Sequence, residues 1–414
     1  MKASSPLGVI ALVPDEWDGI VTVRHHVLRR LARHFPVIWV EPAKSWREYL
    51  LPTGSRFLTP DRWSEPVNGM SVLRTGWRHP SFYRLPWLAA ASLRSRLSLA
   101  RRKLLKDGAK RIALYIWRDE FADALDLIKH DFSCYHIDDE YSFSEREQPT
   151  SWRELRLLER VDQVIVHSLA LLEKKGHVNP RTELIPNGVN FLHFSRPHPE
   201  PSDIAPIARP RIGYAGVIKK QINLGLLIRL AKIRPQYSFV LVGPVVNISG
   251  KEHQVAELKQ LENVFFLGPK PADVLAEYIQ HFDVCLMCYE VNDYTQYIYP
   301  LKLLEYLAAG VPTVSSPIKI VQAFAEAVTI ANTDAEWLYA IEQSLRDEAR
   351  TELAAELRRD FARLNDWDLL VDRIADLFRS GLCQCRGGCA QQPQAAGPAP
   401  GVQAPLSRDD RFRP

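Results

Sequence analysis

Short apolar runs alternate along the chain with segments in which apolar residues recur every three or four positions. Such runs are too short for helices and are typical of strands buried on both faces, whereas the wider spacing predicts amphipathic helices. Strands that alternate with helices predict a parallel sheet with helices on both faces. We therefore expect an α/β chain. The predicted strands are Gly8–Val13, Val37–Val40, Arg111–Trp117, Ser133–Ile137, Gln163–His167, Arg211–Ala215, Ser238–Val242, Val264–Leu267, Asp283–Cys288 and Val311–Ser315.

The alternation is interrupted once, at residues 197–210, where PHPEPSDIAPIARP is rich in proline and has no periodicity. This composition predicts a linker between two doubly wound, Rossmann-like domains, residues 1–196 and 211–364. A last helical pattern covers residues 365–380, with Trp367 at its start. Residues 382–414 have low complexity, and we expect this tail to be disordered.

One stretch, Asp283–Pro317, combines strand, loop, helix, turn and strand. Pro300 suits the first helical position, and Gly310 suits a left-handed helix stop. Lys302 and Glu305 then fall in the first turns of a helix that begins at the carboxyl end of a strand. Anions bind there because of free N–H groups and the helix dipole. Lys302 suits a phosphate and Glu305 a ribose diol. The alternative is a solvated face of an ordinary helix.

The segment YPLKLLEYLAAGVPTVSSP resembles the donor-nucleotide segment of GT-B glycosyltransferases, particularly the large retaining family 4. VDQVIVHSLALL followed by ELIPNGVNFLHF also resembles the end of the first GT-B domain. By element order the resemblance covers residues 8–380. It implies two Rossmann-like domains facing across a cleft, with helix 365–380 crossing back onto the first domain. The family's usual first Glu is replaced here by Tyr297.

The resemblance also implies which residues bind the donor. In the family, the Glu that matches Glu305 binds the ribose of a sugar nucleotide, and the loop after the first strand of the second domain binds its pyrophosphate. In this chain that loop reads GVIKKQIN, so either lysine could take the role, with a solvated loop as the alternative. The predicted donor-binding residues are Gly216, Lys219, Lys220, Tyr299, Pro300, Leu301, Lys302 and Glu305.

Polar residues at the ends of first-domain strands are the candidates for catalysis. His25 lies near the start of the helix after the first strand, and Asp138 and Asp139 follow the strand Ser133–Ile137. A carboxylate can position a hydroxyl or act as a base, and His25 can act as an acid/base group or contact phosphate. A surface-helix role for His25 is the alternative. We predict no metal site, because no second acidic or histidine cluster is spaced to complete one.

Residues 77–111 are rich in arginine, leucine and aromatic side chains. A basic amphipathic helix over residues 88–111 can lie on an anionic membrane. A helix packed on the core, with a solvated basic face, explains the pattern equally well. Liposome flotation distinguishes the two, because no binding at low salt would exclude the membrane role.

Composition limits the remaining possibilities. The 414 residues are 46% hydrophobic and 25% charged, as in soluble globular proteins, and a net charge of +4 does not indicate a nucleic-acid partner. The cysteines form no paired framework, and Cys383, Cys385 and Cys389 lack the partners of a metal site. The start of the chain resembles a strand rather than a signal peptide, and no run is long enough to span a membrane. We expect a cytoplasmic protein, at the inner face of the plasma membrane if its acceptor is lipid-linked.

Together these features predict a metal-independent, hexosyl-type glycosyltransferase without a cofactor. Its donor substrate would be a nucleoside-diphosphate sugar, and its acceptor a hydroxyl of a saccharide or lipid-linked acceptor in cell-surface polysaccharide synthesis. Two alternatives remain open. A sugar-nucleotide epimerase of GT-B shape would convert the donor without an acceptor, and a non-catalytic glycan-binding protein would neither transfer nor hydrolyse it.

Overall fold

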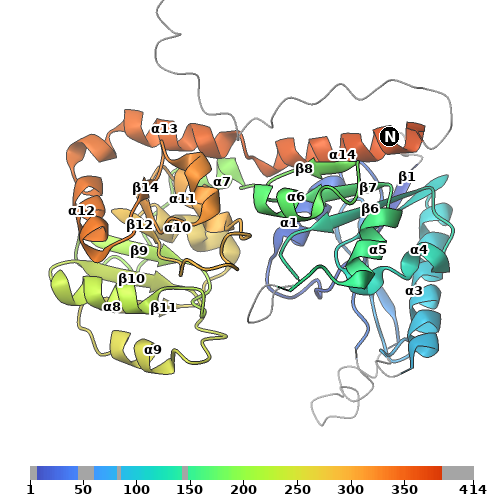
Figure 1. The fold of residues 1–414 in the computed structure, drawn as a ribbon, viewed down its shortest axis with the longest axis horizontal. Helices are drawn as coiled ribbons and strands as arrows, with labels where there is room; N and C mark the ends of the chain where they lie inside the picture. The colour runs from blue at the N-terminus through green and yellow to red at the C-terminus, as the bar shows by residue number, and fades with distance from the viewer. Residues whose placement is uncertain (1–6, 45–59, 82–84, 142–147, 385–414) are drawn as a thin grey trace, which may run out of the picture. The chain divides into compact units, whose positions relative to one another are not determined.

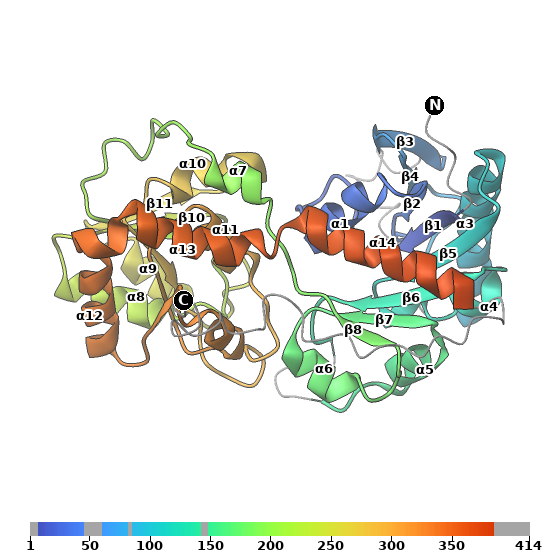
Figure 2. The same cartoon turned by 90° about the horizontal axis from the view of Figure 1, so that it is seen from above.

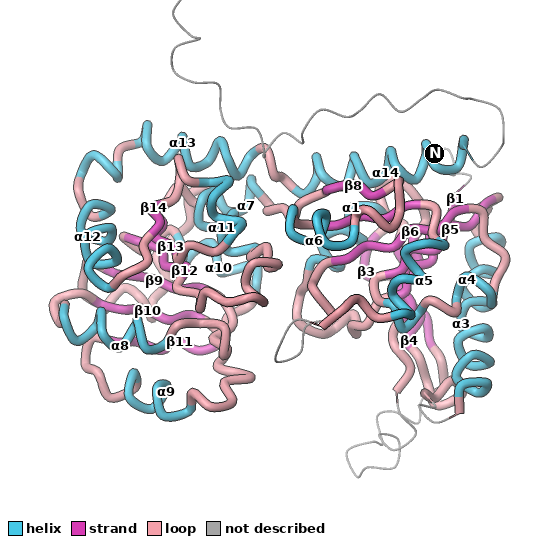
Figure 3. The backbone as a smooth tube through the Cα atoms, viewed as in Figure 1, coloured by secondary structure: helices cyan, strands magenta, loops and turns pink. Residues whose placement is uncertain are grey.

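The computed structural model describes residues 7–44, 60–81, 85–141 and 148–384. These residues form two compact units, each with a sheet between helices (Figures 1 and 3). The first unit includes the chain up to Ile185 and the last helix from Asp368, and the second unit is Pro186–Trp367. The division therefore falls ahead of the linker expected at 197–210.

The first unit contains one mostly parallel sheet, in the order β3-β4-β2-β1-β5-β6-β7-β8. Only the hairpin of β3 and β4 is antiparallel among these pairs. The chain builds outward from β1 on one side and then from β5 on the other, so the sheet has a topological switch point between β1 and β5. The strands are β1 (Leu7–Leu12), β2 (Val37–Val40), β3 (Arg62–Val67), β4 (Met70–Arg74), β5 (Arg111–Ile116), β6 (Phe132–Ile137), β7 (Gln163–Val166) and β8 (Thr182–Leu184).

Helices cover both faces of this sheet, and the last one, α14, lies across its strands (Figure 2). Phe378 of α14 is fully buried among Phe35, Tyr115 and Phe132, with ring centroids 5.1–6.2 Å away. Asp368 adds ion pairs to Arg30 and Arg33, at 2.6 and 2.8 Å. The helices are α1 (Val23–Leu31), α3 (Pro86–Lys106), α4 (Ala124–Leu127), α5 (Trp152–Arg160), α6 (Leu169–Lys175) and α14 (Trp367–Gln384), with a 3-10 turn at Asp119–Phe121.

The second unit contains a fully parallel sheet in the order β11-β10-β9-β12-β13-β14, so its switch point lies between β9 and β12. The strands are β9 (Arg211–Ala215), β10 (Ser238–Val242), β11 (Val264–Gly268), β12 (Val284–Met287), β13 (Thr313–Ser315) and β14 (Thr329–Ile330). The helices are α7 (Phe191–Ser195), α8 (Leu224–Ile233), α9 (Glu252–Leu258), α10 (Leu275–Ile279), α11 (Leu301–Ala308), α12 (Asp334–Ser344) and α13 (Glu352–Arg363). Short 3-10 segments occur at Ala272–Val274, Lys319–Phe324 and Asp347–Arg350.

The segment 197–210 differs from the expected linker. Ile204 and Ile207 are buried in the core of the second unit, so these residues belong to that unit despite their proline content. The sequence analysis also missed the β3–β4 hairpin, whose β3 is largely exposed and therefore lacks the apolar run used to find strands. The predicted tail lies outside the described residues from 385 onward, and with it Cys385 and Cys389, whereas Cys383 is exposed on α14.

In the described part of the chain, no helix combines the length and the apolar character needed to cross a membrane.

Candidate functional site

In the second unit, α11 begins at the switch point, beside the ends of β9 and β12. Pro300 is the N-cap with extended backbone, and Leu301 is the first helical residue, so the helix starts one position later than predicted. Proline has no N–H to leave unsatisfied, and its restricted φ fits the cap as well as the first turn. Gly310 ends the helix at φ +75°, as expected for a left-handed stop.

Tyr306 fixes α11 to the end of β9. The backbone N–H of Ala215 donates to the Tyr306 hydroxyl at 2.8 Å, and this hydroxyl donates back to the Ala215 carbonyl at 3.2 Å. Both residues are buried, so the two bonds occur away from competing water. The first turn of α11 is consequently held against the loop that follows β9.

Lys302 belongs to this first turn, and its side chain packs against the loop, directly over Gly216. Its ammonium group donates to the hydroxyls of Tyr214 and Tyr289, at 2.6 and 3.3 Å. Burial lowers the pKa of Lys302 from its usual 10.5 to about 7, and the nearby charge of Lys219 acts in the same direction. Such a lysine gains a great deal from an anion, which would restore its charged form. This is the strongest sign of a phosphate site in the second unit.

Glycine at position 216 makes this approach possible. Its φ of +133° suits glycine, and a Cβ there would lie 2.8 Å from both Cε and Nζ of Lys302. The neighbouring Gly243, at φ +143°, packs so closely that a Cβ would lie 2.1 Å from the Gly216 carbonyl oxygen. The ends of β9 and β10 therefore pack together through two glycines, at positions where a Cβ would collide with Lys302 or with the Gly216 backbone.

The remaining predicted donor residues lie around Lys302. Lys219 is half-buried and close enough to depress the pKa of Lys302, whereas Lys220 is exposed, so of the two lysines Lys219 is the better placed. Glu305 is half-buried one turn further along α11, and burial raises its pKa to about 7. Tyr299 is buried, and its backbone carbonyl accepts a hydrogen bond from Asn187 at 3.0 Å, which anchors the start of α11.

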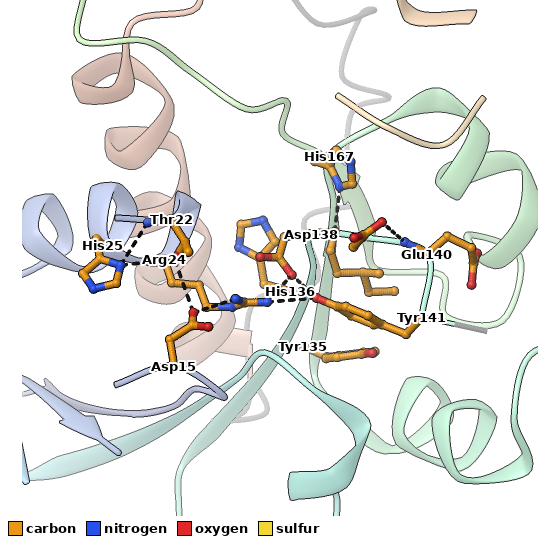
Figure 4. Close-up of polar contacts among 12 residues, drawn as sticks. Asp15, Thr22, Arg24, His25, Tyr135, His136, Asp138, Glu140, Tyr141 and His167 are labelled. Atoms are coloured by element: carbon orange, nitrogen blue, oxygen red, sulfur yellow. Dashed lines mark hydrogen bonds and ion pairs between the residues drawn. The ribbon is translucent and has the colours of Figure 1, made fainter. Parts of the chain in front are cut away.

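In the first unit, a polar network occupies the carboxyl ends of the strands (Figure 4). The guanidinium of Arg24, in the first turn of α1, donates to Asp15 at 2.6 Å and to Asp138 at 2.8 Å. It also donates to the Tyr141 hydroxyl at 3.1 Å, and Tyr141 in turn donates to Asp138. Arg118, after β5, stacks over the Tyr141 ring at 3.9 Å. The network spans the switch point between β1 and β5.

The two predicted carboxylates differ in their surroundings. The Asp138 side chain is only 6% exposed, and burial raises its pKa while the Arg24 cation and the Tyr141 hydroxyl oppose that shift. Asp139 is half-buried, and its carboxylate accepts the backbone N–H of Glu140 at 2.8 Å. Glu140 itself is buried in an ion pair with Lys175, at 3.0 Å, which identifies it as a structural group.

The structure does not support the predicted catalytic role of His25. Its ring is buried between Trp17 and Trp39, with centroids 5.2 and 4.6 Å away. Nδ1 accepts the backbone N–H of Thr22 at 3.1 Å, which leaves Nε2 to donate to the Trp17 carbonyl at 3.1 Å. His25 therefore caps the start of α1 from within the core, and its neighbour Arg24 faces the polar network instead.

Sequence reasoning missed Arg24, Asp15 and Tyr141, and in the second unit it missed Tyr214 and Tyr289. The available signal for Arg24 was its position in the first helical turn after β1, at the switch point. Tyr214 and Tyr289 have no such signal, because each belongs to an apolar stretch and only its hydroxyl reaches Lys302.

The two doubly wound sheets have the GT-B fold, as predicted. Residues 209–347 match the family model described as Glycosyl transferases group 1, which covers most of the second unit and includes Gly216, Lys302 and Glu305. The chain is also similar to TuaH of Bacillus subtilis, which is named as a teichuronic acid biosynthesis glycosyltransferase. The two are 28% identical over 231 residues, 53% of this chain and 57% of TuaH. The match thus spans little more than half of that relative.

Solved structures agree on the fold. HepE from Anabaena in complex with UDP-glucose is 17% identical, with a TM-score of 0.63 over 90% of this chain and 99% of HepE. The trehalose-6-phosphate structure from E. coli bound with UDP-2-fluoro glucose is 14% identical. Its TM-score is 0.65, over 91% of this chain and 99% of its own. Another similar structure is OtsA, a trehalose-6-phosphate synthase, at 14% identity and a TM-score of 0.65, over 92% of this chain and 99% of OtsA.

Proposed function

We propose that this protein transfers a glycosyl group from a nucleoside-diphosphate sugar to a hydroxyl of a saccharide or lipid-linked acceptor in cell-surface polysaccharide synthesis. The observation that carries the proposal is Lys302, held over Gly216 at the switch point of the second unit, with Glu305 one turn further. A diphosphate beside Lys302 would place a ribose near Glu305 if the nucleoside extended along α11. The likeness to TuaH supports the polysaccharide context.

The chemistry then follows from charge. Glycosyl transfer breaks the bond between the sugar and the diphosphate, and negative charge accumulates on the leaving group. Lys302, Lys219 and the N-terminus of α11 would stabilise that charge, which is the work that a metal ion performs in other sites. We therefore propose a metal-independent reaction. In the first unit, Asp138 and Arg24 would position the acceptor hydroxyl, and Asp138 could accept its proton.

The test is an assay of nucleoside-diphosphate release by the full chain, with nucleoside-diphosphate hexoses as donors, in the presence and absence of saccharide acceptors. UDP-hexoses are the first to try, because HepE was solved with UDP-glucose. Acceptor-dependent release that persists in a metal chelator supports the proposal. Conversion of the donor sugar without an acceptor would indicate an epimerase, and no reaction with any donor would favour a glycan-binding protein.

We further propose a peripheral contact with anionic membranes through residues 88–111, most of which form α3. Five residues of α3 are buried against the first unit, which supports the core-packing interpretation for one face: Leu93, Arg96, Leu97, Ala100 and Leu104. The opposite face remains exposed, with Trp87 at 68%. Core packing and membrane contact are therefore compatible on different faces of the same helix. Flotation with anionic vesicles at low salt tests the contact.

A further inference from the structure

A basic pocket lies in the first unit between α3 and the turn that follows α4. Its volume is about 320 Å³, and it is lined by Ser98, Arg101, Arg102, Leu127, Ile128 and Lys129. Lys129 comes shortly before the amino end of β6, whereas Asp138 follows the carboxyl end of that strand. The pocket therefore lies at the amino ends of the strands, whereas the polar network lies at their carboxyl ends. The proposed transfer reaction does not use the pocket.

Hydrogen bonds to residues outside the lining hold the turn that forms one wall of the pocket. Arg94 donates to the Leu127 carbonyl at 3.3 Å, which ties the turn to α3. The ring of His130 bonds the Ile128 carbonyl at 3.0 Å. Asp131 and Ile112 exchange two further bonds, from each backbone N–H to the other residue, at 2.7 and 2.8 Å. The turn is thus held in place before any ligand arrives.

The acids that the structure describes do not neutralise the cations of the pocket. Within the described residues, Arg101, Arg102 and Lys129 form no ion pair, while other arginines of this unit do, such as Arg153 with Asp123. The acids that lie near these cations in sequence have other partners: Asp107 pairs with Lys103 at 3.2 Å, Asp126 pairs with Arg160 at 2.5 Å, and Asp131 accepts the backbone N–H of Ile112. In addition, the Nε of Arg101 is buried without an acceptor among the described groups. The Nε atoms of Arg24, Arg118 and Arg359 are in the same situation, so the three cations without ion pairs are the stronger sign of a ligand. An anion bound by them would also satisfy the Arg101 donor.

We propose that this pocket binds the phosphate of an anionic phospholipid headgroup. Two guanidinium groups match phosphate oxygens in pairs, and Lys129 adds a third cation. Leu127 and Ile128 provide an apolar wall, which suits a phosphate that carries an organic group better than free phosphate. Leu105 is 37% exposed one turn beyond Arg101, so an exposed apolar side chain lies beside the basic site, as at a membrane interface.

The pocket would hold the first unit at the membrane surface, where a lipid-linked acceptor is found. This purpose rests on the proposed function, but lipid binding itself does not, because it can be measured without any transfer reaction. A failure of the transfer assay and a failure of lipid binding are therefore separate results.

The test measures binding of the full chain to phosphatidylcholine vesicles with and without phosphatidylglycerol. The double variant R101Q/R102Q removes two charges from the pocket, and K106Q/K110Q removes two exposed charges nearby but outside its lining. We expect R101Q/R102Q to weaken binding to the phosphatidylglycerol vesicles at least about tenfold more than the control does. Both variants lose the same general attraction to an anionic surface, but only R101Q/R102Q also removes the paired guanidinium contacts to the phosphate. Transfer to a soluble acceptor should be unchanged in both variants.

Several results would overturn the proposal. Equal losses in the two double variants would show attraction by overall charge without a specific pocket. Wild-type binding that does not depend on phosphatidylglycerol would exclude an anionic headgroup. Inorganic phosphate that protects Arg101 and Arg102 from a guanidinium-modifying reagent, with no vesicle binding, would assign the pocket to a free phosphate ligand. Circular dichroism and thermal unfolding of both variants establish that they are folded before these results are compared.

Discussion

Lys302 shows how one side chain joins the fold to the proposed reaction. Burial against Tyr214, Tyr289 and Gly216 weakens its hold on the proton, and its pKa of about 7 leaves it ready to gain charge when an anion binds. Glu305, with a pKa raised to about 7, has the opposite tendency. Burial of these two ionisable groups costs free energy. A diphosphate beside Lys302 and a diol beside Glu305 would offset that cost by giving each group a hydrogen-bond partner.

The pKa of Lys302 predicts a pH dependence. A diphosphate prefers the protonated lysine, so binding raises the pKa of Lys302. The contribution of Lys302 to affinity should therefore be fully present below pH about 7 and fall as the pH rises, by up to about tenfold per pH unit. The contribution of Glu305 needs its carboxylate and changes in the opposite direction over the same range. Lys302→Arg retains its charge and should flatten this decline. The measurement is calorimetric titration of a nucleoside diphosphate between about pH 6 and 9, a range that brackets the pKa of Lys302. The same pH profile in the wild type and in Lys302→Arg would contradict the assignment.

The network of Arg24 predicts a separate effect on turnover. Asp138→Asn removes the carboxylate charge that would accept the acceptor proton, so the transfer rate should fall by about a hundredfold or more. Nucleoside-diphosphate affinity should stay the same, because the donor residues belong to the second unit. Asp139→Asn is the matched control, since that carboxylate bonds the backbone of Glu140. Steady-state rates and titrations separate the two effects, and equal losses of rate in both variants would refute the assignment to Asp138.

At the scale of elements, sheet order decides where the candidate site forms. Apolar runs were enough to predict β2 and β9 at their observed bounds, because strands buried on both faces have a continuous apolar signal. The β3–β4 hairpin gave no such signal. The sequence also placed Lys302 and Glu305 correctly on the first turns of α11, because the chemistry of Pro300 and Gly310 marks both ends of that helix.

What could not be predicted depends on contacts between elements that are distant in sequence. His25 and Arg24 are adjacent and both polar, and only packing against Trp17 and Trp39 determines which of them enters the core. In the same way, nothing local shows that Ile204 and Ile207 join the second core. The proline content of residues 197–210 correctly indicated a break in regular structure, but it does not show whether the side chains of this segment are exposed or buried.

The contact between β9 and α11 predicts the effect of a glycine substitution. Gly216→Ala would place a Cβ 2.8 Å from Lys302 and strain a backbone with φ +133°. We expect nucleoside-diphosphate affinity to fall at least about tenfold, through displacement of Lys302, together with a loss of stability of about 1 kcal/mol or more. Gly250→Ala is the control, because Gly250 also has a positive φ, at +83°, but a Cβ there meets nothing within 4 Å.

The control separates backbone strain from displacement of the lysine. Gly250→Ala should lose a similar amount of stability and keep its affinity for nucleoside diphosphates. Thermal unfolding and titration of the two variants give both quantities. If both variants lose affinity alike, the close approach of Lys302 to Gly216 is not what matters for binding.

At the scale of the whole molecule, the chain leaves the first unit at Ile185 and returns to it at Asp368, so helix α14 completes a unit whose sheet was built much earlier. Phe378→Ala should destabilise the first unit by about 3–5 kcal/mol, because it removes a fully buried ring from between Phe35, Tyr115 and Phe132. Leu369→Ala on the same helix, where the side chain is 54% exposed, should change stability by less than about 0.5 kcal/mol. Denaturant unfolding compares them, and similar small effects would mean that α14 does not stabilise the first unit.

The central claim is that the second unit binds a nucleoside-diphosphate sugar through Lys302 and Glu305. The most direct measurement is calorimetric titration of nucleoside diphosphates, and of their sugar conjugates, into the wild-type chain and Glu305→Ala, without metal and then with magnesium. We predict binding of one diphosphate without metal. Loss of the charged hydrogen bonds in Glu305→Ala should weaken that binding by about 1.5–3 kcal/mol. No binding of any nucleoside diphosphate, or an unchanged affinity in Glu305→Ala, would contradict the account.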